Sequence, residues 1–134
     1  MPPVLVDSNV LLDVLTEDPR WFEWSARELE NAAELHPLVL NPLVYAEVSI
    51  RFARIEDLDD ALPQSLFQRE PLPWEAAFLA GKVYLRYRRS GGSRRSPLPD
   101  FYIGAHAAVA GYILLTRDAG RYREYFPTLE LRSP

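Results

Sequence analysis

The sequence predicts a three-layer α/β/α domain around a central, mostly parallel sheet of four to five strands. Three short aliphatic runs, at residues 4–6, 38–40 and 113–116, have the composition of strands buried on both faces. Segments with helical spacing separate these runs, and such alternation is typical of a parallel sheet with helices on both sides. A length of 134 residues fits one domain that spans residues 1–134.

The first half of the chain carries clear signals for the ends of its helices. Asp7, Ser8 and Asn9 supply N-cap chemistry directly after the first strand. Pro37 ends the second helix, and Asn41 with the following proline begins the third. The elements expected are helices over 10–15, 21–35 and 42–53, a short helix with its closing loop over 57–66, and a brief edge strand at 66–67.

The second half contains the longest predicted helix and the most buried one. Serine and glycine residues at 90–93 end the long helix, and a loop leads to Pro99. The helix after Asp100 is apolar nearly all round, which predicts a central, buried position. The elements expected are helices over 74–89, 100–111 and 119–125 and strands at 113–116 and 129–131.

The composition excludes several classes of protein. The absence of cysteine excludes a disulfide scaffold, a cysteine-based zinc site and a thiol nucleophile. The N-terminus lacks the basic start of a signal peptide. The longest uncharged stretch, residues 101–116, is shorter than the ~20 apolar residues that a membrane span needs. We therefore expect a cytoplasmic protein without a membrane partner.

Positive charge is concentrated in one segment of an acidic chain. The net charge is −4 and the isoelectric point is about 5.2, yet residues 82–99 contain six basic side chains and no acid. The field near such a segment can attract a polyanion whatever the total charge. The alternative is a solvated helix end followed by a basic loop.

Four acidic residues are predicted to converge at one edge of the sheet. Asp7 directly follows the first strand, and Asp118 follows the strand at 113–116. The carboxyl ends of parallel strands share one edge, where open α/β folds bind ligands. Glu47 occupies an apolar helix stripe, and Asp100 opens a helix that is otherwise almost uncharged.

Each of these acids also has a structural explanation. Asp7, Asp100 and Asp118 can cap helices, and Glu47 can pair with Arg51 one turn later. If the four carboxylates converge, however, two charges 4 Å apart repel by about 4 kcal/mol at an effective dielectric near 20. Such a cluster must take up protons or bind a cation. Oxygen ligands alone select Mg²⁺ or Mn²⁺, whose usual chemistry at carboxylates is phosphodiester or phosphoryl transfer.

The pattern of motifs resembles the PIN-domain ribonucleases, and among them the VapC-type toxins of bacterial type II toxin–antitoxin systems. The resemblance spans essentially the whole chain, which reads as a single PIN domain over 1–134. It depends on four motifs in this order: VLVDSNVLL at 4–12, YAEV at 45–48, PDFYIGAHA at 99–107 and LLTRD at 114–118.

The resemblance implies a metal-dependent endoribonuclease that requires Mg²⁺, or Mn²⁺, and hydrolyses RNA. It implies Asp7, Glu47, Asp100 and Asp118 as metal-binding catalytic acids, with Glu47 binding a second ion or orienting the attacking water. It places Ser8, Asn9 and Thr116 beside them. It also implies a homodimer and an inhibitory antitoxin protein, which together form a hetero-oligomer. Apart from the resemblance, the predicted RNA contacts are Arg94, Arg95 and Arg117.

Three other classes of protein are alternatives to this interpretation. A haloacid-dehalogenase-like phosphatase needs an aspartate at position 9 and a late lysine, whereas the chain has Asn9 and one lysine, Lys82. A response-regulator receiver fails because Asp57 does not follow a buried strand. The stronger alternative is a PIN-like module that binds RNA or a protein without cutting it.

Several aromatic residues are expected to pack rather than to act. His106 lies inside an apolar helix, which predicts a core or dimer-contact histidine. Tyr122, Tyr125 and Phe126 could stack on bases, but core packing is the preferred interpretation.

Overall fold

The computed structural model describes residues 1–91 and 98–134, and within them the strands form one five-stranded sheet in the order β3-β2-β1-β4-β5. Each pair of neighbouring strands is parallel, so the predicted sheet is confirmed. The brief strand after residue 66 lies at an edge, as expected. The strands are β1 (Val4–Val6), β2 (Leu38–Leu40), β3 (Phe67–Arg69), β4 (Ile113–Leu115) and β5 (Leu131–Arg132).

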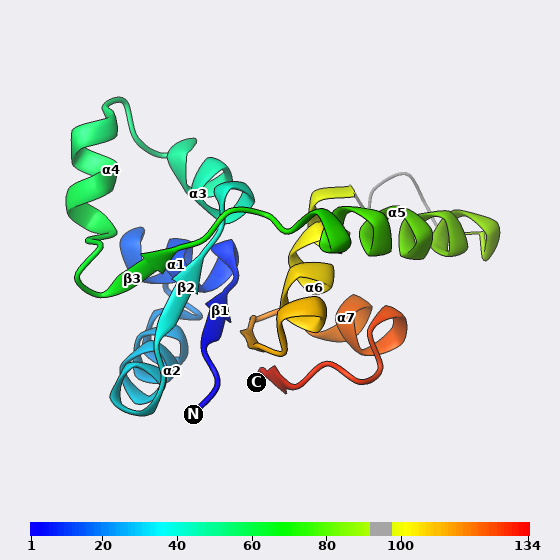
Figure 1. Cartoon of the computed structure of the whole chain (residues 1–134). Coiled ribbons are helices and arrows are strands. Elements are labelled where there is room, and N and C mark those ends of the chain that lie inside the picture. The colour runs from blue at the N-terminus through cyan, green and yellow to red at the C-terminus, as the bar shows by residue number, and fades with distance from the viewer. Residues whose placement is uncertain (92–97) are drawn as a thin grey trace.

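Helices cover both faces of this sheet, which gives the predicted three layers. In Figure 1, α1 and α2 lie on one side of the strands and α6 and α7 on the other, while α5 lies along α6 and projects outward. The helices are α1 (Ser8–Leu15), α2 (Phe22–Leu35), α3 (Pro42–Ser49), α4 (Ile55–Ala61), α5 (Trp74–Arg89), α6 (Leu98–Ala110) and α7 (Gly120–Tyr125). In the described part of the chain, none of them is both long and apolar enough to cross a membrane.

The central helix is α6, as its composition predicts. Its buried residues include Phe101, Ile103 and His106. Gly104 is required there, because a Cβ atom at this position would lie 2.6 Å from the ring of Phe126 and 3.0 Å from that of Tyr122. This close approach lets α7 pack directly onto α6, beside the carboxyl end of β4.

His106 is a core residue. Its side chain is fully buried, and its Nδ1 lies 3.1 Å from the amide nitrogen of Asn41. Burial lowers the pKa of His106, so the ring is neutral at physiological pH. The core interpretation of this histidine is therefore the one that the structure supports.

Three predicted boundaries were wrong. Helix α3 ends at Ser49 rather than near residue 53, because the chain turns there and the Phe52 amide donates to the Ser49 carbonyl at 3.0 Å. Helix α4 begins at Ile55 rather than 57, and β5 begins at Leu131 rather than 129. The stripe expected around Glu47 is not a buried face, since Ile50 is 81% exposed.

Candidate active site

The four acids predicted to converge line one pocket of about 200 Å³. The pocket lies at the carboxyl ends of β1 and β4, where the parallel sheet places the side chains that follow its strands. Three uncharged side chains complete its wall. The lining residues are Asp7, Ser8, Asn9, Glu47, Asp100, Asp118 and Tyr122.

Asp7 lies at the bottom of this pocket and is 5% exposed. It caps α1, because its Oδ1 accepts the Ser8 amide at 2.8 Å. Its Oδ2 accepts the Thr116 hydroxyl at 2.9 Å and the Tyr122 hydroxyl at 3.2 Å. Asp7 therefore caps α1 through Oδ1 and also lines the pocket, where Oδ2 accepts two side-chain hydroxyls.

Burial raises the pKa of Asp7 above its usual value. The hydrogen bonds from Thr116, Ser8 and Tyr122 oppose this shift, and the negative charge of Asp100 adds to it. Removing water from a carboxylate disfavours its charged form, and a second carboxylate nearby does the same. Asp7 is thus held by three donors in surroundings that still favour a proton or a cation.

Glu47 projects from α3 toward the same pocket. Its Oε1 accepts the Ser8 hydroxyl at 3.1 Å, so its hydrogen bond goes to α1 rather than to Arg51. Partial burial raises the pKa of Glu47, the bond from Ser8 lowers it, and the charges of Asp7 and Asp100 raise it further. The negative charges of Asp7 and Asp100 therefore act on Glu47, and that of Asp100 also acts on Asp7.

Asp100 and Asp118 form the outer part of the pocket. Asp100 lies in the first turn of α6, which begins at Leu98, and it is half-buried. Asp118 is exposed, and its amide donates to Thr116 Oγ1 at 3.1 Å. Helix α7 begins only at Gly120 with Ala119 at the N-cap position, so Asp118 does not cap it.

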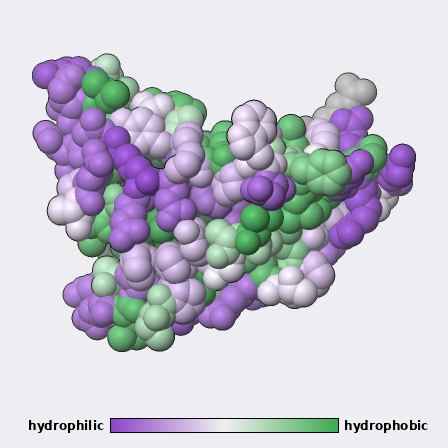
Figure 2. Space-filling model, viewed as in Figure 1, coloured by the Kyte–Doolittle hydropathy of each residue, from purple (hydrophilic) through white to green (hydrophobic). Residues whose placement is uncertain are grey.

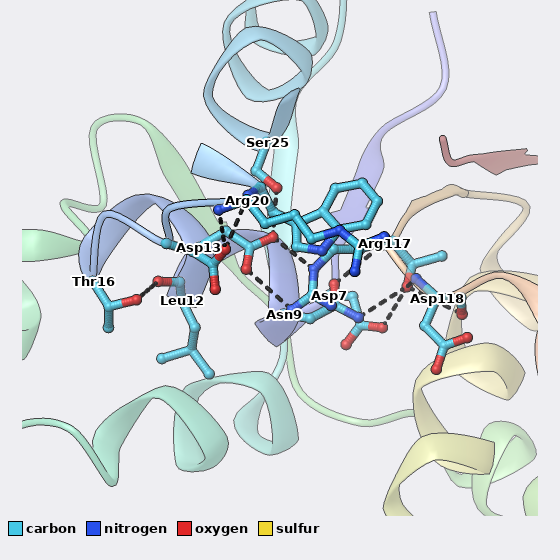
Figure 3. A network of polar contacts seen from close by, with 12 residues as sticks. Asp7, Asn9, Leu12, Asp13, Thr16, Arg20, Ser25, Arg117 and Asp118 are labelled. Atoms are coloured by element: carbon cyan, nitrogen blue, oxygen red, sulfur yellow. Dashed lines mark hydrogen bonds and ion pairs between the residues drawn. The ribbon is translucent and has the colours of Figure 1, made fainter. Parts of the chain in front are cut away.

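The polar residues predicted beside the acids do lie there. Figure 3 shows Asn9 between Asp7 and Arg117. The Asn9 amide nitrogen donates to Thr116 Oγ1 at 3.3 Å, and its Oδ1 accepts the Arg117 amide at 3.1 Å. The Thr116 hydroxyl thus donates to one acid and accepts from the backbone of another.

Two residues at the site have contacts that the sequence did not indicate. Tyr122 is buried as expected, but its hydroxyl also reaches Asp7, and burial beside Asp7 and Asp100 raises the pKa of Tyr122 well above its usual value. Asp13 is 2% exposed and pairs with Arg117. A charged residue on the otherwise uncharged helix 8–15 is the one signal that could have singled out Asp13.

Of the three arginines predicted to contact RNA, Arg117 lies within the described residues. Arg94 and Arg95 lie outside the described residues. Arg117 has an intramolecular partner, because its Nε donates to Asp13 Oδ2 at 2.8 Å and its Nη2 donates to Oδ1 at 3.1 Å.

The donor set of the acid pocket fits a hard divalent cation. As the side chains are arranged, no three acidic or histidine side chains in the described ranges are close enough to bind an ion without adjustment. The pocket nevertheless offers four carboxylates, and burial together with the neighbouring negative charges raises the pKa values of Asp7 and Glu47. Oxygen ligands of this kind match Mg²⁺ or Mn²⁺.

A larger pocket of about 400 Å³ lies elsewhere, along the ends of β2 and β3. Two of its polar side chains share one partner: the Tyr45 hydroxyl and Arg69 both donate to Asp59, at 2.8 and 2.7 Å. We therefore assign the chemistry to the smaller acid pocket.

Comparisons with known proteins agree with this geometry. A family model described as the PIN domain matches residues 4–125. Comparison with curated protein sequences gives no match.

Similar solved structures cover nearly the whole chain. They include VapBC2 from Rickettsia felis bound to a promoter DNA fragment (17% identity, 98% of each chain, TM-score 0.77). They also include VapBC-1 from nontypeable Haemophilus influenzae (16% identity, 98% of this chain and 97% of that one, TM-score 0.73). A toxin–antitoxin complex from Klebsiella pneumoniae is similar over 87% of this chain and 88% of the other (19% identity, TM-score 0.66). At these identities the likeness establishes a shared fold.

Proposed function

The chain belongs to the PIN domain family, and from this premise we propose that it is a Mg²⁺- or Mn²⁺-dependent endoribonuclease. One observation carries the proposal: Asp7, Glu47, Asp100 and Asp118 come from four separate segments and line a single pocket. A structural explanation of each acid alone does not require this convergence. Ion binding at the pocket does, because it compensates charges that otherwise repel.

The four acids would hold the ion, with Asp7 as the most firmly placed of them. When bound, a divalent ion supplies positive charge at the scissile phosphate and lowers the pKa of a coordinated water. The three donors on Asp7 fix its carboxylate in one orientation, so that little freedom is lost on binding.

Glu47 is the acid best suited to accept a proton from the attacking water. Its Oε1 is held by the Ser8 hydroxyl at 3.1 Å, which leaves Oε2 as the accepting atom. Burial and the neighbouring charges raise the pKa of Glu47, and a carboxylate with a raised pKa is a stronger general base near neutral pH.

The basic end of α5 supports RNA as the polyanion. The last turn of α5 contains Arg86, Arg88 and Arg89. Tyr87 in the same turn packs against Phe101, at 5.2 Å between ring centres, so this basic turn lies next to the segment that carries Asp100. Figure 2 shows hydrophilic residues gathered at this outer end of α5. Contacts with phosphates would orient the strand without reading its sequence.

We further propose that the protein is the toxin of a toxin–antitoxin pair. The similar solved structures include VapBC proteins and a toxin–antitoxin complex, and their likeness covers 87–98% of the chain. A homodimer that binds an inhibitory antitoxin protein, with which it forms a hetero-oligomer, fits this role.

A non-catalytic PIN-like module that binds RNA or a protein is the second candidate. The observation in its favour is that the acids, within the described residues, form no ready-made ion site. Binding of Mn²⁺ without RNA cleavage would support this candidate.

Cleavage of total cellular RNA tests the proposed activity. Purified protein is incubated with Mg²⁺, with Mn²⁺ or with EDTA, alongside Asp7→Asn and the control Asp60→Asn, which changes an exposed acid of α4. We expect discrete fragments from the wild type and the control only when the metal is present, and none from Asp7→Asn. Activity of Asp7→Asn near the wild-type level, or cleavage in EDTA, would contradict the proposal.

A further inference from the structure

We propose that the ion pair between Asp13 and Arg117 positions Asp118 in the acid pocket. In this role both are positioning residues, and Arg117 is not an RNA contact. The inference deepens the proposed function and rests on it. It concerns the loop between β4 and α7, which has to present an exposed acid at a fixed place.

One edge of the Arg117 guanidinium is held at two points by Asp13. Nε and Nη2 donate to the two oxygens of Asp13, at 2.8 and 3.1 Å. Asp13 is 2% exposed and also accepts the Ser25 hydroxyl from α2 at 2.8 Å. Paired, two-point bonds of this kind are short and directional, and they fix an arginine more firmly than a single contact does.

The guanidinium of Arg117 also lies over the ring of Trp21. The carbon at the centre of the Arg117 guanidinium lies 5.4 Å from the ring centre of Trp21, within the range of a cation–π contact. Asp18 orders the segment that carries this ring, because its Oδ1 accepts the amides of Arg20 and Trp21, both at 2.9 Å. Figure 3 shows Arg117 beside Asp13, with dashed lines that mark the contacts between them.

The backbone of the same loop is attached to α1. The Arg117 amide donates to Asn9 Oδ1 at 3.1 Å, and the Asp118 amide donates to Thr116 Oγ1 at 3.1 Å. Helix α1 therefore binds the loop twice, through Asn9 at the backbone and through Asp13 at the side chain. Asp7 is the N-cap residue of the same helix.

These attachments determine where the Asp118 carboxylate lies. Asp118 is exposed, and no side chain in the described part of the chain donates to its carboxylate. Its position relative to Asp7 therefore depends on the loop backbone. If Arg117 turned away to bind a phosphate, it would leave the buried charge of Asp13 without its partner, which is strongly unfavourable.

Mn²⁺ binding to the metal-free protein tests this inference. The dissociation constant is measured by titration calorimetry for the wild type, Asp13→Asn, Arg117→Gln and Arg117→Lys. Arg20→Gln is the matched control, because Arg20 stacks on the same Trp21 ring at 5.2 Å but is exposed and lies apart from the Asp13 pair. We expect about a tenfold or larger rise in the dissociation constant for Asp13→Asn and Arg117→Gln. Arg117→Lys should show a smaller rise, and the control none.

Amide hydrogen exchange provides a readout that does not depend on metal. In metal-free Arg117→Gln, the amides of Arg117 and Asp118 should exchange faster while those of β4 keep their protection. This measurement also shows that the variant is folded. If Asp13→Asn does not fold, the two Arg117 variants decide the outcome.

RNA binding separates positioning from phosphate contact. In the cleavage-deficient background Asp7→Asn, Arg117→Gln should leave the salt dependence of RNA affinity unchanged, because no phosphate contact is lost. A slope reduced by about one unit would overturn the inference, as would folded variants with wild-type Mn²⁺ affinity. If the wild type binds Mn²⁺ and the Asp13 and Arg117 variants bind it equally well, only this inference is contradicted. A wild type that binds no Mn²⁺ contradicts the proposed function as well.

Discussion

The Thr116 hydroxyl donates to Asp7 Oδ2 at 2.9 Å, although 109 residues separate the two in the sequence. Thr116 Oγ1 also accepts the Asp118 amide at 3.1 Å. One fully buried hydroxyl therefore joins the ends of β1 and β4 and links the most buried acid of the pocket to the most exposed one. Asp7 and Asp118 are thereby linked through Thr116 at the shared edge of the parallel sheet.

Replacing Thr116 with valine removes this link with almost no change of shape. Thr116→Val should lower the free energy of unfolding by about 1–3 kcal/mol, because Asp7 loses a donor while it stays buried. Mn²⁺ affinity should fall about 10- to 100-fold, as expected when a group that orients a ligand is removed. Urea unfolding and calorimetric titration measure the two effects. Thr128→Val, at an exposed position, is the control, and equal effects of both variants would contradict the role of Thr116.

The two helical glycines Gly104 and Gly81 should respond to alanine in opposite directions. A Cβ atom at Gly104 would lie 2.6 Å from Phe126 and 3.0 Å from Tyr122, so Gly104→Ala should destabilise the fold by about 1–3 kcal/mol. Gly81 lies in α5 with no atom within 4 Å of such a Cβ atom, so Gly81→Ala should stabilise it by about 0.5–1 kcal/mol. Thermal unfolding measures both. A Gly104→Ala protein as stable as the wild type would contradict the close packing of α6 on α7.

The buried Asp7 should make stability depend on pH in the metal-free protein. Because burial raises the pKa of Asp7 in the folded state, the folded chain holds more protons than the unfolded chain between that raised pKa and the usual value of 3.8. Stability contributed by this residue therefore rises as the pH falls through that window, and ionised Asp7 is a cost at neutral pH.

Asp7→Asn removes that cost. The stability that Asp7→Asn gains over the wild type is measured in EDTA as the difference in free energy of unfolding. This gain should therefore be larger at pH 7 than at pH 4. Asp60→Asn is the control for the substitution itself. A difference that is constant with pH, or larger at pH 4, would show that Asp7 is not held in a desolvated site.

For Arg94 and Arg95, which lie outside the described residues, contact with RNA stays a prediction. Arg94→Ala combined with Arg95→Ala should weaken RNA binding and reduce the slope of log affinity against log salt by about one unit for each lost phosphate contact. The measurement uses fluorescence anisotropy in the cleavage-deficient Asp7→Asn background. Arg54→Ala, which removes an exposed arginine paired with Glu56 at 3.3 Å, is the control. An unchanged slope would make these arginines part of a solvated loop.

Much of the fold follows from local patterns in the sequence. Helix α5 has the predicted bounds, because its apolar stripe is regular and a serine–glycine run ends it. The end of α3 and the start of α4 were predicted less well, since tertiary packing and turns decide where a helix begins and ends once its periodicity weakens. Ile50 shows the same limit: its spacing suggests a buried stripe, yet the turn after Ser49 leaves it exposed.

The acids of the pocket were predictable for a topological reason. Parallel strands place the residues that follow them at one edge, so Asp7 and Asp118 could be paired without a structure. The partners of Asp13 and the hydroxyl contact of Tyr122 could not, because those contacts depend on how α1, α7 and the β4–α7 loop pack. Arg117 illustrates the difference: the sequence predicted an RNA contact for it and did not indicate its bonds to the buried carboxylate of Asp13.

Direct measurement of Mn²⁺ binding tests the central claim, that the four carboxylates act as one ion site. Electron paramagnetic resonance is used to titrate Mn²⁺ into the wild type, Asp7→Asn, Glu47→Gln, Asp100→Asn, Asp118→Asn and the exposed control Glu56→Gln. We predict that the wild type and the control bind with the same affinity and that each pocket variant binds about tenfold more weakly or worse. A wild type without saturable binding, or pocket variants that bind as tightly as the control, would contradict the account.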